Sequence, residues 1–126
     1  MSKRIISTAA AAAPAGAYNQ GILVNGTLYT AGFGPRDPAT GAIVGSDVEE
    51  QTRQVFANLQ AVLAECGMDL SNVVKATVHL DDVARDARAF NETYARLMPA
   101  PYPVRTTVGS TLNGILVEID VVAVTS

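Results

Sequence analysis

The sequence of 126 residues holds a single cysteine, Cys66, a single histidine, His79, and no tryptophan. One cysteine excludes a disulfide within the chain and suits a reducing compartment. A zinc site or a Cys–His catalytic pair needs more such residues, so we expect no bound metal. We interpret Cys66 as an inert, packed thiol and His79 as a surface or interface residue.

Charged residues are also few, at 17% of the chain, and they sum to −3 at pH 7. This acidic balance disfavours a nucleic-acid partner, which usually needs a basic face. No apolar run reaches the length of about 18 residues that a transmembrane helix needs, so we expect no membrane partner. The alanine-rich start has only Ile5 and Ile6 as large apolar residues, too few for a signal peptide. We therefore expect a cytoplasmic protein.

Apolar residues, in contrast, make up 48% of the chain. This length and composition are typical of one globular domain, and we expect residues 1–126 to form it. Because charges are few, we expect part of the apolar surface to lie in an oligomer interface.

The first half of the chain has clear local signals. Two apolar runs, residues 22–24 and 27–31, flank Asn25-Gly26 and predict a β-hairpin. The segment Ser46–Glu49 has the S-x-x-E spacing of a capping box and predicts the start of a helix, and Gly67 predicts its end. The apolar face of this helix is Val55, Phe56, Leu59, Val62, Leu63 and Cys66.

The second half adds a second helix and more strands. Asp81 and Asp82 can cap a helix that Pro99 ends. Strands are predicted at residues 104–108 and 116–124, at a short edge segment over 5–8, and where Val74, Ala76, Val78 and Leu80 alternate with polar residues. The order predicts an α+β domain with two helices packed on one face of a mixed β-sheet.

Arg105 is the first candidate for chemistry. Side chains alternate along a strand, so Arg105 and Thr107 are expected on one face, with Val104, Thr106 and Val108 on the other. We expect the apolar set to meet the helices and Arg105 to point away from them. An arginine offers a planar fork for a carboxylate or phosphate. The alternative is a solvated surface arginine.

Glu118 is the second candidate. In the last strand it shares a face with Asp120, between apolar residues at the two ends of that face. A carboxylate among apolar neighbours is partly desolvated, which raises its pKa and suits acid–base work. The alternative is an exposed carboxylate or a salt bridge. A face of this kind is expected to be covered in part by another subunit.

The chain also resembles a known family, YjgF/RidA, which is also called the UK114 or L-PSP group. The resemblance runs from about residue 5 to residue 124, nearly the whole chain, and its segments follow in the family's order at nearly its spacing. The matching segments are Pro14–Gly21, Tyr29–Gly32, Val73–Val78, Phe90–Tyr94, Pro103–Arg105 and Val117–Ile119.

This resemblance implies a chorismate-mutase-like fold and a homotrimer with a barrel-like core and active sites between subunits. It also implies hydrolysis of 2-imino acids and their enamine tautomers, such as 2-iminobutanoate and 2-iminopropanoate, to 2-keto acids and ammonia. The family needs neither metal nor organic cofactor for this reaction. The implied partners are therefore a small 2-imino or 2-keto acid and two further copies of the chain.

The resemblance further implies roles for individual residues. Arg105 matches the arginine that binds the substrate carboxylate, and Glu118 matches the glutamate that positions or activates water. Tyr18 matches a tyrosine near the reacting group, Asn91 an asparagine beside the cleft, and Gly32 a backbone position that lines the pocket.

Three departures alter the expected substrate-binding wall. Ala31, Phe33 and Thr107 stand where the family commonly has serine, glutamine and cysteine, so the pocket is expected to be less polar and to lack a reactive thiol.

Two other functions stay open. One is an endoribonuclease or translation inhibitor of the L-PSP type, and the other is a trimer that binds keto acids without turnover.

Overall fold

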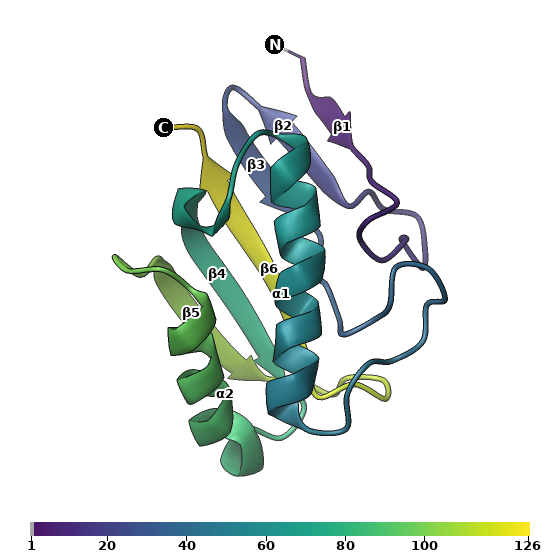
Figure 1. The fold of residues 1–126 in the computed structure, drawn as a ribbon, viewed down its shortest axis with the longest axis vertical. Helices are drawn as coiled ribbons and strands as arrows, with labels where there is room; N and C mark the ends of the chain where they lie inside the picture. The colour runs from purple at the N-terminus through teal and green to yellow at the C-terminus, as the bar shows by residue number, and fades with distance from the viewer. Residues whose placement is uncertain (1) are drawn as a thin grey trace.

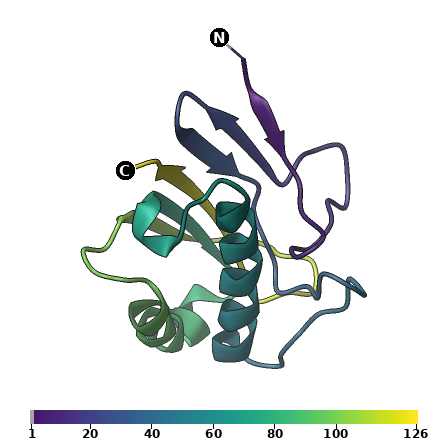
Figure 2. The same cartoon turned by 45° about the horizontal axis from the view of Figure 1, so that its top comes forward.

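One six-stranded mixed sheet, in the order β1-β2-β3-β6-β4-β5, carries two helices on one of its faces (Figures 1 and 2). The computed structural model describes residues 2–126. Among the strands within this range, only β4 and β5 pair in parallel, and the other neighbours are antiparallel. The elements are β1 Arg4–Ile6, β2 Gly21–Val24, β3 Thr27–Thr30, α1 Val48–Glu65, η1 Leu70–Asn72, β4 Val73–Leu80, α2 Val83–Leu97, β5 Val104–Gly109 and β6 Val117–Val124. The predicted α+β class, with both helices on one face, is confirmed.

The hairpin between β2 and β3 forms as its turn residues predict. Asn25 and Gly26 have φ angles of 50° and 77°, and Val24 pairs with Thr27 across them. Both central positions of such a turn need positive φ, which Asn and Gly tolerate best. The edge strand β1 forms at residues 4–6 rather than at the predicted 5–8, and it pairs with β2.

Helix α1 begins one residue later than the S-x-x-E pattern predicts. Its N-cap is Asp47, whose side chain accepts a hydrogen bond from the Glu50 backbone at 2.8 Å. Glu50 reaches back to the backbone N–H of Ser46 at 2.9 Å. The overlapping D-x-x-E pattern therefore forms the cap, and the Ser46–Glu49 assignment was wrong. Asp and Ser are comparable N-caps, so the sequence alone does not rank them.

Both helices end where the sequence predicts. After α1, the Gly67 N–H bonds to Ala64 and the Met68 N–H bonds to Leu63, with Gly67 at φ 67°. These two bonds satisfy carbonyls that the helix end leaves unpaired. Helix α2 starts after Asp82, which accepts from the Arg85 N–H, and ends ahead of Pro99.

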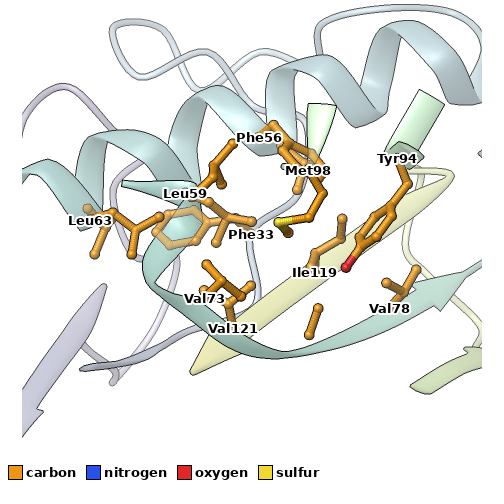
Figure 3. Packing of buried hydrophobic residues seen from close by; sticks show 14 of the residues in the cluster. Phe33, Phe56, Leu59, Leu63, Val73, Val78, Tyr94, Met98, Ile119 and Val121 are labelled. Atoms are coloured by element: carbon orange, nitrogen blue, oxygen red, sulfur yellow. The ribbon is translucent and has the colours of Figure 1, made fainter. Parts of the chain in front are cut away.

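The core lies between the helices and one face of the sheet (Figure 3). The predicted apolar face of β6 is buried throughout, and α1 buries the side chains of its predicted face except for half-buried Cys66. Side chains from the two helices meet the central strands there, including Phe56, Leu59, Leu63, Phe90, Tyr94, Val78, Ile119 and Val121.

Strand β4 contains a bulge that shifts its alternation. Val73 pairs with Ala123 and Lys75 pairs with Val122, so Val74 is an extra residue between them. Val74 is 43% exposed and Val73 is buried, whereas the alternation predicted Val74 on the buried face. A bulge inserts one residue against the partner strand and reverses the pattern on one side of it.

In the described part of the chain, the other face of the sheet bears no helix, and we call it the open face (Figure 2). Strand pairing and burial assign to it Tyr29, Lys75, Thr77, His79, Val104, Thr106, Val108, Glu118, Asp120, Val122 and Val124. It therefore combines ionisable groups in its middle with exposed apolar side chains around them.

Candidate active site

Arg105 lies on the helix side of the sheet, so the predicted orientation was wrong. In the parallel register, Arg105 pairs with Ala76 and Thr107 pairs with Val78, and these β4 residues are buried under the helices. Arg105 and Thr107 thus share a face, as expected, but it is the face toward α2. Because β5 is an edge strand, its apolar residues lie exposed on the open face, with Val104 at 69%.

The guanidinium of Arg105 is held by residues of α2. Its Nη2 donates to Asn91 Oδ1 at 2.7 Å, and its Cζ lies 4.7 Å from the centroid of the Tyr94 ring and 5.6 Å from that of Phe90. Asn91, Tyr94 and Arg105 border a cavity of about 410 Å³ together with Tyr102. This arrangement leaves an exposed cationic fork at one edge of the sheet.

Glu118 occupies a second place, on the open face, between two adjoining cavities. Cavities of about 590 Å³ and 360 Å³ are both bordered by Tyr18, Gly32 and Glu118. Gly32 approaches the carboxylate closely, since a Cβ at Gly32 would lie 2.7 Å from Glu118 Oε2. Only a glycine leaves room for the carboxylate in this position.

A bulge in the β3–β6 pairing creates this close approach. Tyr29 pairs with Val122 and Phe33 pairs with Ile119, so residues 30–32 oppose only residues 120–121. The Thr30 hydroxyl accepts a hydrogen bond from the Val121 N–H at 3.0 Å and so fills part of the gap in the ladder. Bulges of this kind often lie beside active sites, where they redirect the chain.

Gln20 is a site-building residue that the sequence reasoning missed. Its buried side chain donates to the carbonyl oxygens of Thr8, Ala11 and Ala12 and accepts from the Thr8 N–H. It thereby ties down the alanine-rich segment next to Tyr18, whose hydroxyl accepts from the Ala15 N–H at 3.0 Å. The available signal was a glutamine two residues after Tyr18, directly ahead of an apolar run.

The predicted site residues therefore fall into two groups. Tyr18, Ala31, Gly32 and Glu118 meet at one place, bordering the larger cavity. Asn91, Arg105 and Thr107 belong to the other, between β5 and α2. Phe33 borders the smaller cavity, but its side chain is 5% exposed and packs in the core (Figure 3).

The two groups do not meet within one chain. Glu118 pairs with His79 of β4 on the open face, whereas Arg105 pairs with Ala76 of β4 on the helix side. Strand β4 separates them, and they point to opposite faces of the sheet. A site that uses both residues therefore needs two copies of the chain.

On the open face, the pKa of one carboxylate is raised by burial. Burial raises the pKa of Asp120, while His79 and Lys75 oppose this rise. His79 Nδ1 lies 2.7 Å from Ser110 Oγ. Elsewhere, burial raises the pKa of the Cys66 thiol, in agreement with an inert cysteine.

We expect Asp120→Asn to increase the free energy of unfolding at pH 7. A raised pKa means that the folded state binds the proton more tightly than the unfolded state, so stability falls as pH rises above about 3.8. Asparagine removes this penalty, and the gain should vanish below that pH. Thermal melts between pH 3 and 7 measure it, with Asp69→Asn as the control. Hydrogen bonds from Ser71 lower the pKa of Asp69, so that variant should lose stability at pH 7. A loss at pH 7 in both variants would contradict the assignment.

Within residues 2–126, no three His, Cys, Asp or Glu side chains are grouped to hold a metal ion. In the same part of the chain, neither helix has the length and apolarity that crossing a bilayer requires.

Comparison with known proteins gives consistent matches over the whole fold. The family described as Endoribonuclease L-PSP matches residues 8–125. A 2-iminobutanoate/2-iminopropanoate deaminase of Capra hircus is 40% identical over 97% of this chain and 90% of its own length. The structure of YyfA from Yersinia pestis, titled a protein of unknown function of the conserved Rid family, has a TM-score of 0.92 at 37% identity, covering 98% of this chain and 100% of that one. The structure of E. coli TdcF with bound serine has a TM-score of 0.90 at 31% identity, covering 98% and 99%.

Proposed function

We propose that this chain, which belongs to the Endoribonuclease L-PSP (YjgF/RidA) family, hydrolyses 2-imino acids and their enamine tautomers to 2-keto acids and ammonia. The observation that carries the proposal is the pair of half-sites on opposite faces of the sheet, one cationic at Arg105 and one acidic at Glu118. An arginine fork can bind the substrate carboxylate, and a carboxylate can orient the attacking water.

The proposed site forms between copies of the chain. Arg105 of one copy binds the substrate carboxylate, and Glu118 of a neighbouring copy orients a water molecule toward the imine carbon. The water oxygen bonds to that carbon, and the nitrogen takes up a proton. The carbinolamine hydroxyl then gives up its proton, the nitrogen takes up a second proton, and the C–N bond breaks so that ammonia leaves as the carbonyl forms. Because an imine carbon is already electrophilic, the site mainly has to orient the two reactants.

Two further observations support the proposal. The goat relative carries the name of an imine deaminase at 40% identity. The TdcF structure is described with bound serine. Like a 2-imino acid, serine has a carboxylate and a nitrogen attached to its α-carbon. Tyr18 lines the cavity that contains Glu118, where its phenol lies near the reacting carbon in the proposed complex.

The assay that tests this function measures ammonia from 2-iminobutanoate or 2-iminopropanoate generated enzymatically in the cuvette. We expect release faster than the spontaneous rate. Failure to accelerate release, together with tight binding of 2-ketobutyrate, would favour a trimer that binds keto acids without turnover. Cleavage of RNA by the purified chain would favour the endoribonuclease activity of the family's name. The acidic net charge of −3 argues against the endoribonuclease function.

We expect a homotrimer of about 39 kDa, three times the subunit mass of 13.1 kDa. The physical reason is the open face, where Tyr29 and Val104 are more than half exposed and apolar. Light scattering at micromolar concentration measures the mass. A monomer would remove any site shared between copies, and a dimer would remove the threefold arrangement.

We expect Gly32→Ala to lower kcat/KM on the order of 10²-fold, with little change in melting temperature. The new Cβ would lie 2.7 Å from Glu118 Oε2, so the carboxylate has to move away from its place. The matched control is Gly109→Ala on β5, where the Cβ would meet only the Val83 side chain at 3.2 Å. Steady-state kinetics of both variants check this, and equal rates in the two would contradict the placement of Glu118.

A further inference from the structure

We propose that Tyr94 is a positioning residue for Arg105. Its ring face holds the guanidinium, so that the fork is oriented for a carboxylate before the ligand arrives. This inference rests on the function proposed above and adds one residue to its cationic half-site.

Three residues from one stretch of α2 surround the guanidinium. The Tyr94 ring centroid lies 4.7 Å from Arg105 Cζ, well inside the roughly 6 Å at which a ring face attracts a cation. Phe90 is farther away, at 5.6 Å. Asn91 Oδ1 accepts from Nη2 at 2.7 Å and fixes the rotation of the group in its plane. The Tyr94 ring therefore makes the main contact with the guanidinium, and Asn91 binds one of its amino groups by a hydrogen bond.

None of these contacts neutralises the cation. Arg105 forms no salt bridge with an acidic side chain within residues 2–126, whereas Arg85 of α2 is paired with Asp86 at 2.8 Å. A carboxylate neighbour would compete with an incoming anion for the same N–H donors. A ring face and an amide oxygen restrain the long side chain and leave its positive charge and remaining donors for the ligand.

The ring of Tyr94, rather than its hydroxyl, makes the contact. The hydroxyl is buried and has no hydrogen-bond partner within the described residues, so it does not reach the cavity. The ring itself is held by Phe56 at 5.8 Å in a T-shaped contact and by Phe90 at 5.7 Å. Packing of these rings in the core thus fixes the ring face over which the guanidinium lies.

Variants of Tyr94 can distinguish a positioning role from that of an ordinary core aromatic residue. Tyr94→Phe keeps the ring face and should retain the wild-type KM and the wild-type affinity for 2-ketobutyrate. Tyr94→Leu removes the face and should weaken 2-ketobutyrate binding and raise KM on the order of 3- to 30-fold, with a smaller change in kcat. Leu63→Ala is the control, because Leu63 is a fully buried core residue of α1 that lies about two helical turns from Phe56, away from the ring cluster (Figure 3).

A second readout does not depend on turnover. In the wild-type protein, the Arg105 side-chain Nε–H and Cδ protons should show upfield ring-current shifts by NMR, retained in Tyr94→Phe and Leu63→Ala and lost in Tyr94→Leu. Unshifted resonances in the wild type, or equal weakening of 2-ketobutyrate binding in Tyr94→Leu and Leu63→Ala, would overturn the inference. If imine hydrolysis is absent while the shifts and the binding pattern are present, the proposed function fails and the positioning role stands.

Discussion

Arg105→Ala is expected to abolish imine hydrolysis while leaving the melting temperature and the oligomer mass nearly unchanged. Removing one partner of a desolvated, bidentate charge pair costs about 2–5 kcal/mol. Since 1.36 kcal/mol corresponds to a factor of ten, kcat/KM should fall on the order of 30- to 5,000-fold. The fold should tolerate the change, because Arg105 is exposed and forms no salt bridge in the described part of the chain.

Two further variants make this result specific. Arg105→Lys should restore only part of the rate, because an ammonium group is a point charge and cannot form the planar fork. Arg88→Ala removes another arginine whose side chain is 93% exposed on α2, and it should change kcat/KM by less than about threefold. Steady-state kinetics decide between the readings. Wild-type turnover in Arg105→Ala would contradict the anchor role and favour the alternative, a solvated surface arginine.

The sequence predicted those elements whose signals are local. Asn25-Gly26 defines its own turn, and Gly67 ends α1, because each needs a backbone conformation that few residues tolerate. The strict alternation of β6 also predicted its buried face, since a central strand under the helices has only one such face. Each of these signals is complete within a few residues of the chain.

The errors arose where the answer depends on a distant partner. The bulge at Val74 exists only relative to β6, so no pattern within β4 reveals it. The orientation of Arg105 depends on the position of β5 at the sheet edge, where the apolar side chains need not face the helices. An apolar set on an edge strand is equally suited to another subunit, and alternation alone does not choose between the two.

The sequence predicted which residues belong to the candidate site, but not that they lie in two separate half-sites. The family resemblance named Tyr18, Gly32, Glu118, Asn91 and Arg105, and each lines a cavity in the structure. That Glu118 and Arg105 point to opposite faces of one sheet follows only from the register of three strands. This division makes an experiment with mixed subunits informative.

Glu118→Gln is expected to lower kcat on the order of 10²- to 10⁴-fold with little change in KM, because glutamine keeps the shape but loses the charge that orients or deprotonates water. Asp120→Asn is the matched control, since Asp120 lies two residues along on the same open face and borders neither cavity. Steady-state kinetics measure both. Equal turnover in the two variants would remove Glu118 from the reaction.

Mixing the two inactive variants tests whether the site is shared. An unfolded and refolded equimolar mixture of Arg105→Ala and Glu118→Gln subunits contains sites in which one copy supplies Arg105 and its neighbour supplies Glu118. If subunits in a ring of three combine at random, about one quarter of the sites are intact, and the mixture should recover about that share of the wild-type rate. A site within one chain would carry one of the two lesions in every copy and recover nothing. Because Glu118 and Arg105 lie on opposite faces of the sheet with β4 between them, we expect recovery.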